Sequence, residues 1–402
     1  MSIESERATP KEHYRQVVLH TPFHARTAAL NQLNLWHRWR DYTVSDAYYS
    51  ETLEYTALRN STAVFDASPL TKHRISGPDS QAFLNRLMTR DVATIAPKRV
   101  AYCVWCDDDG QVIDDGTLFH LEPGVYRLCS QERQADWLNR AAFGFDVTLE
   151  EESHQIAALA VQGPTSATVL MKAGFAVENL KPFELDKFTL DGMEFEISRT
   201  GYTGDLGYEV FCANEHALFL WDRLFAAGEP YGISPMGTLA LEVARLEAGF
   251  IQAGADFLPA DHMIRANRSR SPFELDLARL VDFKKPFFNG RAALKKEAER
   301  GFQRQLLRLK VSGNKVAKDA YLYNERREHI GSVTSATWSP MLKQSVAIAT
   351  VNRELWLRSE QIIAEIYYKK ELHWSRVNVP CEVVNGPFFD PPRRKANPPA
   401  RV

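Results

Sequence analysis

Apolar residues recur along most of the chain at the spacings that are typical of short strands and short helices. Between about residues 60 and 300, alternating runs such as RVAYCVWC (99–106) are interspersed with runs such as HALFLWDRLFAAG (216–228), whose apolar side chains return every three or four positions. Gly249, directly after the helix-like run PMGTLALEVARLEAG, indicates where that helix ends. This mixture of short elements predicts an α+β fold.

The two ends of the chain have a different pattern from the middle. After Gly301, alternating strands recur with turn residues between them, as in RQLLRLKVSG (304–313) and QSVAIATVN (344–352). We expect a separate small β-barrel or sandwich at 302–390, followed by a loosely held, Pro-rich tail at 391–402. The aromatic-rich residues 1–54 are predicted to form a helical extension, and residues 55–301 two α+β subdomains.

Composition narrows the class of protein but does not identify it. The 402 residues carry a net charge of −2 without a basic stripe, so nucleic acid and anionic membranes are not expected as partners. The first residues are polar and no run of about 18 apolar residues occurs, which indicates a cytoplasmic protein. Five scattered cysteines, including Cys103 and Cys106 in a strand-like run, predict neither a disulfide framework nor a metal site.

A glycine-spaced segment, SRTGYTGDLGYEVF (198–211), interrupts two strand-like runs and predicts a hairpin. Its glycines stand three residues apart, and Glu209 follows them inside an apolar strand. Two interpretations are open at this point. Glu209 points to solvent beside an ordinary glycine-rich turn, or the glycines admit a ligand and Glu209 binds it.

A second pair of acids lies in GQVIDDGTLFHL (110–121). Because side chains alternate across a strand, Asp114 and Asp115 must point to opposite faces, and one of them points inward or toward a cleft. A desolvated carboxylate beside a ligand nitrogen polarises that nitrogen. The alternative is a turn acid beside the polar loop at 107–110.

The motifs of dinucleotide-binding proteins, P-loop proteins, α/β-hydrolases and zinc peptidases are absent from the sequence. What remains is carboxylate and aromatic chemistry around a flat, nitrogen-bearing ligand, with Tyr102 and Tyr202 as candidate walls.

The hairpin SRTGYTGDLGYEVF closely resembles the signature of the glycine-cleavage T-protein (aminomethyltransferase) family of tetrahydrofolate-dependent one-carbon transferases. The resemblance covers about residues 55 to 390. Further segments resemble the family in the same order: VFDASPLTKHRISGPDSQAFLNRLMTRDV, YCVWCDDDGQVIDDGTLF, ALAVQGP, ARLEAGF, SPFELDLARLVDFKKPFFNGRAALKK and IGSVTSATWSPMLKQSVAIATV.

The resemblance implies a three-domain cloverleaf with a C-terminal β-barrel-like domain and a central folate channel. It also implies that tetrahydrofolate is the cofactor, that Glu209 grips the pterin ring, and that Asp115 lies beside the reacting nitrogen. Tyr102 and Tyr202 match channel tyrosines, with Tyr102 acting beside Asp115, and Phe183 is expected as a further cofactor contact. No metal is expected.

The chain departs from the family where the one-carbon donor is expected to bind. Leu241 stands where the family commonly has arginine, and Gln252 begins a segment whose sequence differs from that of the family. An insertion at 257–270 carries Arg265, Arg268 and Arg270, which we expect to meet a carboxylate of the one-carbon donor. The alternative is a solvated surface loop.

These departures favour a tetrahydrofolate-dependent methyltransferase that demethylates a small methylated substrate. The first alternative is a T-protein aminomethyltransferase, which would also need a lipoylated carrier protein as partner. The second alternative is a non-catalytic folate-binding protein, although the cysteine-containing signature of that branch is missing here.

Overall fold

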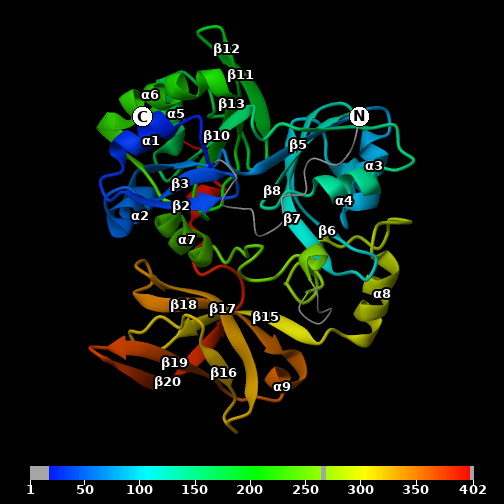
Figure 1. Cartoon of the computed structure of the whole chain (residues 1–402), viewed down its shortest axis with the longest axis vertical. Coiled ribbons are helices and arrows are strands. Elements are labelled where there is room, and N and C mark those ends of the chain that lie inside the picture. The colour runs from blue at the N-terminus through cyan, green and yellow to red at the C-terminus, as the bar shows by residue number, and fades with distance from the viewer. Residues whose placement is uncertain (1–17, 264–268, 399–402) are drawn as a thin grey trace.

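The computed structural model describes residues 18–263 and 269–398, which form three sheets and one closed barrel (Figure 1). Helices and sheets are mixed up to about residue 300, and the barrel follows. The predicted α+β fold with a C-terminal barrel is therefore confirmed. Within the described residues, no helix is both long enough and apolar enough to span a membrane.

Residues 18–50 form a small three-stranded sheet, and the prediction of a helical extension is wrong for most of these residues. The sheet has the order β1 (Leu19–His20), β3 (Tyr42–Ala47), β2 (Leu35–Trp39), and among residues 18–50 the one helix is α1 (His24–Leu30). The run LWHRW forms β2, which pairs antiparallel with β3, because aromatic residues favour strands. Arg40 turns the chain with φ 56°.

A six-stranded sheet follows α2 (Glu51–Asn60). Its order is β11 (Leu185–Leu190), β12 (Met193–Ser198), β13 (Gly207–Ala213), β10 (Ile156–Gln162), β4 (Thr62–Asp66), β14 (Ile233–Pro235). Helices α5 (Ser166–Ala173) and α6 (Ala217–Gly228) share one apolar core with it. A second core joins the sheet to α2 and α7 (Thr238–Glu247).

The five-stranded sheet has the order β6 (Arg99–Cys106), β7 (Val112–Glu122), β8 (Val125–Ser130), β5 (Thr71–Ser76), β9 (Thr148–Glu151). Helices α3 (Ser80–Leu87) and α4 (Ala135–Ala141) contribute Phe83 and Leu138 to its core, which also buries Trp105. The two larger sheets lie side by side above the barrel in Figure 1.

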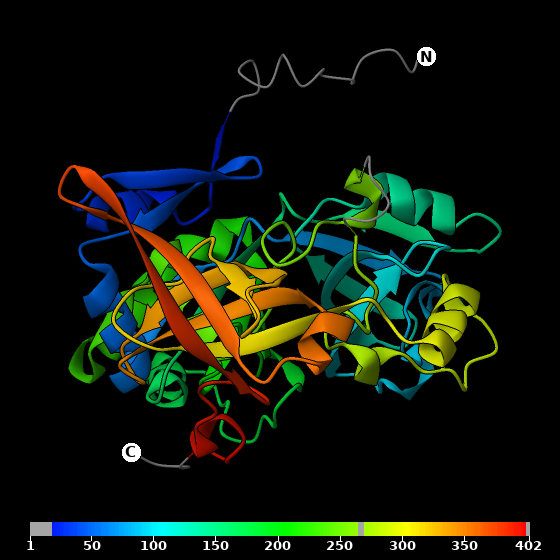
Figure 2. The same cartoon turned by 90° about the horizontal axis from the view of Figure 1, so that it is seen from below.

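Helix α8 (Arg291–Arg300) leads into the barrel, whose order is β15 (Arg304–Val311), β18 (Gln344–Asn352), β17 (His329–Ser339), β16 (Tyr321–Tyr323), β19 (Ile362–Lys370), β20 (His373–Val384). The ring closes through pairing of β15 with β20, and α9 (Arg353–Leu357) follows β18. Figure 2 shows the barrel strands crossing in front of the two sheets. Leu246 of α7 shares a core with Ile348 of β18, so the barrel packs on the sheet domain.

The C-terminal segment is held by several side chains, so the prediction of a loosely held tail at 391–402 is wrong for its described part. The guanidinium of Arg199 donates to the carbonyl of Arg394 at 3.3 Å and to that of Ala396 at 2.5 Å. Phe389 N donates to Glu247 O at 2.8 Å. The segment therefore runs back from the barrel to the six-stranded sheet.

The glycine-spaced loop between β12 and β13 encloses the side chain of Gln162. A Cβ atom at Gly201 or Gly207 would lie 2.0 or 2.2 Å from Gln162 Oε1. Gln162 Nε2 donates to Thr200 O at 3.2 Å and to Tyr208 O at 3.1 Å, and its Oε1 accepts from Thr203 Oγ1 at 2.8 Å. Two of the three glycines are therefore required by this close approach.

Gly204 provides a test of how closely this loop is packed. It has φ 71°, and an added Cβ would lie 2.6 Å from Ala248 Cβ, whereas Gly192 has φ 79° with no atom within 4 Å of its added Cβ. Gly192→Ala should cost about 1–2 kcal/mol of unfolding free energy for the left-handed backbone alone. Gly204→Ala should cost about 1–3 kcal/mol more, because of overpacking against Ala248. Urea denaturation of both variants measures the difference, and equal losses would contradict the packing argument.

Candidate functional site

A cavity of about 1030 Å³ lies where the sheets, α7, the barrel and the C-terminal segment meet. Its wall combines β2, β6 and β7 with β10, β13 and α7, and with loops at 199–206 and 249–253. Most of the predicted site residues line it. These are Tyr102, Asp115, Phe183, Tyr202, Glu209 and Gln252.

Glu209 lies on one wall, in a row of side chains that crosses the six-stranded sheet. The strand register pairs Ala160 with Phe65 on one side and with Glu209 on the other, so all three share a face. The indole of Trp39 lies 6.0 Å from the ring of Phe65, between centroids. The row therefore places a carboxylate at one end of an apolar, aromatic surface.

One oxygen of the Glu209 carboxylate is engaged and the other has no protein hydrogen bond among the described residues. Thr200 Oγ1 donates to Glu209 Oε2, and Ser198 Oγ lies 2.6 Å from Thr200 Oγ1. Burial raises the pKa of Glu209, while the Thr200 hydroxyl and the Lys72 ammonium oppose that rise. The group is an ordered hydrogen-bond acceptor on the cavity wall.

Asp115 and Tyr102 form a second polar group, on the β6–β7 hairpin. Tyr102 Oη donates to Asp115 Oδ2 at 2.6 Å. Burial raises the pKa of Asp115 to about 6, against the lowering effect of this hydrogen bond, and Asp256 adds to the rise. Burial also raises the pKa of Tyr102, so its hydroxyl keeps its proton at neutral pH.

Asp114 points to the opposite face of β7, as the alternation of the strand requires. It is fully buried and accepts from Asp115 N at 2.9 Å and from Glu132 N at 3.2 Å. Asp114 therefore holds the backbone of its own strand and of the segment after β8, and Asp115 is the acid that lines the cavity.

Tyr202 and Phe183 extend the aromatic lining. The ring of Tyr202 stacks on Phe250 with centroids 5.5 Å apart, and its hydroxyl donates to Ile251 O at 2.5 Å. Phe183 adopts φ 61°, and its backbone joins the two larger sheets by donating to Arg199 O and accepting from Val100 N. Both side chains are partly exposed, as residues that face a cavity would be.

The predicted arginine cluster is not supported at the cavity. Arg265 and Arg268 lie outside the described residues. Arg270 is not part of the cavity wall, because its carbonyl accepts from Val112 N at 2.8 Å and fixes it beside the start of β7. Of the two predicted contacts to the one-carbon donor that lie in the described residues, Gln252 lines the cavity and Arg270 does not.

The sequence analysis missed Arg245, a fully buried arginine of α7 that also borders the cavity. Its Nη1 donates to Asp256 Oδ2 at 2.6 Å, and its Nε donates to Glu242 Oε2 at 2.8 Å. Its Nη2 donates to Ser335 Oγ of the barrel at 2.8 Å. A charged residue inside the apolar run TLALEVARLE was the available signal, since a buried charge needs partners.

No group of three or more potential metal ligands occurs among residues 18–263 and 269–398. The polar groups on the cavity wall include carboxylates, tyrosine hydroxyls and guanidinium groups, arranged between aromatic side chains.

Comparison with known proteins identifies the family. The GCVT N-terminal domain matches residues 19–285, and the glycine cleavage T-protein C-terminal barrel domain matches residues 304–390. An aminomethyltransferase of Bacillus subtilis (strain 168) is 32% identical over 345 residues, which cover 84% of this chain and 90% of that protein. An aminomethyltransferase of Streptomyces coelicolor is 35% identical over 314 residues, covering 76% and 82%.

The crystal structure of glycine cleavage system aminomethyltransferase T from Bartonella henselae superposes with a TM-score of 0.81. It is 23% identical and covers 93% of this chain and 98% of that chain, so the two proteins share a fold. The family models span most of the sequence and agree with the sheets and barrel described above. The chain therefore belongs to the glycine-cleavage T-protein family.

Proposed function

We propose that this protein is a tetrahydrofolate-dependent one-carbon transferase that takes an aminomethyl group from a lipoylated carrier protein. The observation that carries the proposal is the placement of Glu209 and the Tyr102–Asp115 pair on the wall of one aromatic cavity. The relatives named aminomethyltransferase support the same reaction class.

The residues present fit tetrahydrofolate in chemistry and in size. The cavity volume is at the upper end of the range of about 300–1,000 Å³ that small-molecule sites usually occupy. Glu209 would accept hydrogen bonds from the N–H edge of the pterin, while Tyr202 and Phe183 would lie against its flat rings. When bound, tetrahydrofolate supplies the nitrogen atoms that accept the one-carbon unit.

Asp115 and Tyr102 would act where the carbon is transferred. With a pKa of about 6, Asp115 is mostly ionised at neutral pH yet close enough to that range to accept a proton. The Tyr102 hydroxyl holds the carboxylate in one orientation by donating to Oδ2. The surrounding aromatic side chains exclude water, which strengthens both interactions.

A second candidate function is demethylation of a small methylated substrate, with tetrahydrofolate as acceptor. It is favoured by Leu241, which lines the cavity at the position where the family resemblance leads one to expect arginine. An apolar side chain there suits an uncharged or methyl-bearing group better than a carboxylate.

The product of the reaction distinguishes the two candidates. The protein would be incubated with tetrahydrofolate and either an aminomethylated lipoyl carrier or a panel of methylated amines, sulfonium compounds and aryl ethers. Methylene-tetrahydrofolate and ammonia, formed only with the carrier, support the aminomethyltransferase. Methyl-tetrahydrofolate formed without a carrier supports the demethylase, and no folate product with any of them would refute both.

Replacement of Glu209 should weaken tetrahydrofolate binding. Glu209→Gln keeps the shape of the side chain but removes its charge, so we expect the dissociation constant to rise by about tenfold or more, as for a lost charge-assisted hydrogen bond. Titration calorimetry measures the effect. Glu194→Gln, on the neighbouring strand β12 and exposed, is the control. Equal affinity of wild type and Glu209→Gln would remove Glu209 from the site.

Titration of Asp115 should produce an acidic limb near pH 6 in the pH dependence of the transfer rate. Below its pKa of about 6 the carboxylate is protonated, so the rate of the transfer step should fall as pH decreases through this value. Tyr102→Phe removes the hydroxyl that lowers this pKa, and the limb should therefore move to higher pH. Asp115→Asn should be slower by about 100-fold and should have lost the limb. A limb that persists in Asp115→Asn must belong to another group.

A further inference from the structure

The C-terminal residues 391–398 lie beyond the segments that match the family, yet they contact the glycine-spaced loop that carries Tyr202. Arg393 Nε donates to Asp205 Oδ1 at 2.6 Å, and its Nη2 donates to Asp205 Oδ2 at 2.8 Å. The same Nη2 donates to the carbonyl of Arg59 at 3.3 Å. A guanidinium that forks onto one carboxylate fixes the position and the orientation of that group.

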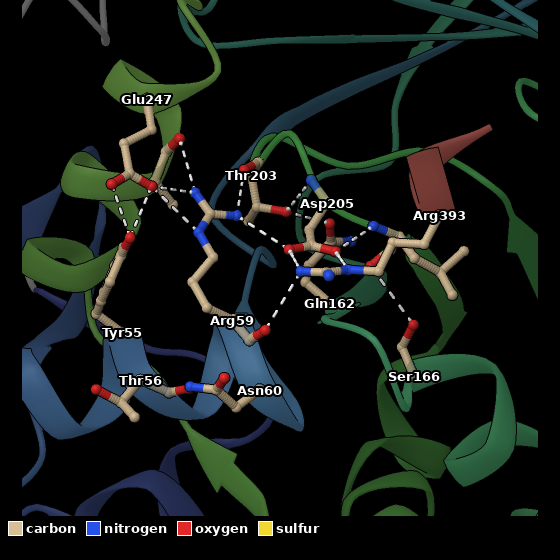
Figure 3. Close-up of polar contacts among 12 residues, drawn as sticks. Tyr55, Thr56, Arg59, Asn60, Gln162, Ser166, Thr203, Asp205, Glu247 and Arg393 are labelled. Atoms are coloured by element: carbon tan, nitrogen blue, oxygen red, sulfur yellow. Dashed lines mark hydrogen bonds and ion pairs between the residues drawn. The ribbon is translucent and has the colours of Figure 1, made fainter. Parts of the chain in front are cut away.

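This contact completes a set of four charged side chains, drawn in Figure 3, of which Arg59, Asp205 and Glu247 are buried and Arg393 is partly exposed. The side chains of Asp205 and Glu247 are both fully buried. Arg59 contacts each of them, with Nη2 2.7 Å from Glu247 Oε2 and Nη1 3.2 Å from Asp205 Oδ2. Arg59 alone would leave two carboxylates with one positive charge, and Arg393 supplies the second. Without it, one buried negative charge would lack a full partner.

Arg393 is connected to the cavity indirectly, through the loop whose Asp205 it binds. Asp205 lies three residues after Tyr202, and Arg59 Nη1 also donates to Thr203 O at 3.0 Å. The neighbouring Arg394 lies over the ring of Phe250 at 5.4 Å, and that ring stacks on Tyr202. Arg394 itself lines the cavity.

We propose that Arg393 is a positioning residue for the loop at 199–206, which carries Thr200 and Tyr202 to the cavity. It acts through Asp205 and contacts neither tetrahydrofolate nor the one-carbon donor. The predicted effect of Arg393 on tetrahydrofolate binding rests on the proposed function. The ordering of the loop by Arg393 is a property of the free protein.

The experiment therefore has two parts that can fail separately. In the first part, hydrogen–deuterium exchange of the free protein follows the peptide that spans 199–206. Arg393→Gln should speed its exchange by about tenfold, the change expected for loss of a charge-assisted hydrogen bond. The matched control is Arg26→Gln, because Arg26 forks onto Asp222 with the same geometry, at 2.7 Å for both bonds, but on the exposed surface.

A double variant tests the charge argument. Arg393→Gln combined with Asp205→Asn removes one charge of each sign and leaves the Arg59–Glu247 pair balanced. Its loop should exchange more slowly than that of Arg393→Gln alone, whereas a purely steric role predicts no such recovery. Arg393→Lys keeps the charge without the fork and should lie between wild type and Arg393→Gln.

In the second part, calorimetry measures tetrahydrofolate binding by the same variants. Arg393→Gln should raise the dissociation constant by about tenfold, as expected for loss of a charge-assisted contact, and should leave the KM of the one-carbon donor within twofold. Unchanged exchange at 199–206 would overturn the positioning role whatever the ligand. Faster exchange in a protein whose wild type does not bind tetrahydrofolate would retain the positioning role and refute the proposed function.

Discussion

The ion network around Arg59 is the interaction on which the arrangement of the domains depends. Arg59 lies in the last turn of α2, Glu247 is the last residue of α7, and Asp205 lies in the glycine-spaced loop. The three side chains are almost completely removed from solvent. Tyr55 and Ser339 complete the hydrogen bonds of Glu247, at 2.7 and 2.6 Å to Oε1, and Ser339 belongs to the barrel. Because removing one partner of a buried ion pair costs about 3–5 kcal/mol, these segments cannot separate independently.

This constraint explains why the cavity lies where it does. Helix α7 contributes Glu247 to the network and presents Leu241, Glu242 and Arg245 to the cavity, from about half a turn to two turns earlier in the helix. The glycine-spaced loop contributes Asp205 to the network and presents Thr200 and Tyr202 to the cavity. The buried charges fix the backbone of α7 and of the loop, and this keeps the side chains that face the cavity in place. A preorganised binding site requires such fixed side chains.

The sequence predicted those features that depend on local periodicity. Alternation along 110–121 required Asp114 and Asp115 to face opposite sides, and the family resemblance selected Asp115, which lines the cavity. The same reasoning failed at residues 35–47, where Trp36, Trp39 and Tyr42 recur every three residues, as in a helix, although the segment forms an antiparallel hairpin. It could not find the ion network, because Arg59 and Arg393 are separated by 334 residues and only the fold brings them together.

The cavity wall has two groups of side chains, and this bears on the choice of one-carbon donor. Glu209, Tyr202 and the Tyr102–Asp115 pair form one group, which would bind the pterin under the proposed function. The N-terminal hairpin adds His37, Arg38 and Trp39, and α7 adds Leu241. His37 Nδ1 lies 2.8 Å from Asp46 Oδ1, which also accepts from Thr238 Oγ1 at 2.8 Å, so the hairpin is anchored to the start of α7. The Asp46–Thr238 contact couples the hairpin to α7 on this side of the cavity, so under the proposed function a change of one-carbon donor would require compatible changes in both elements.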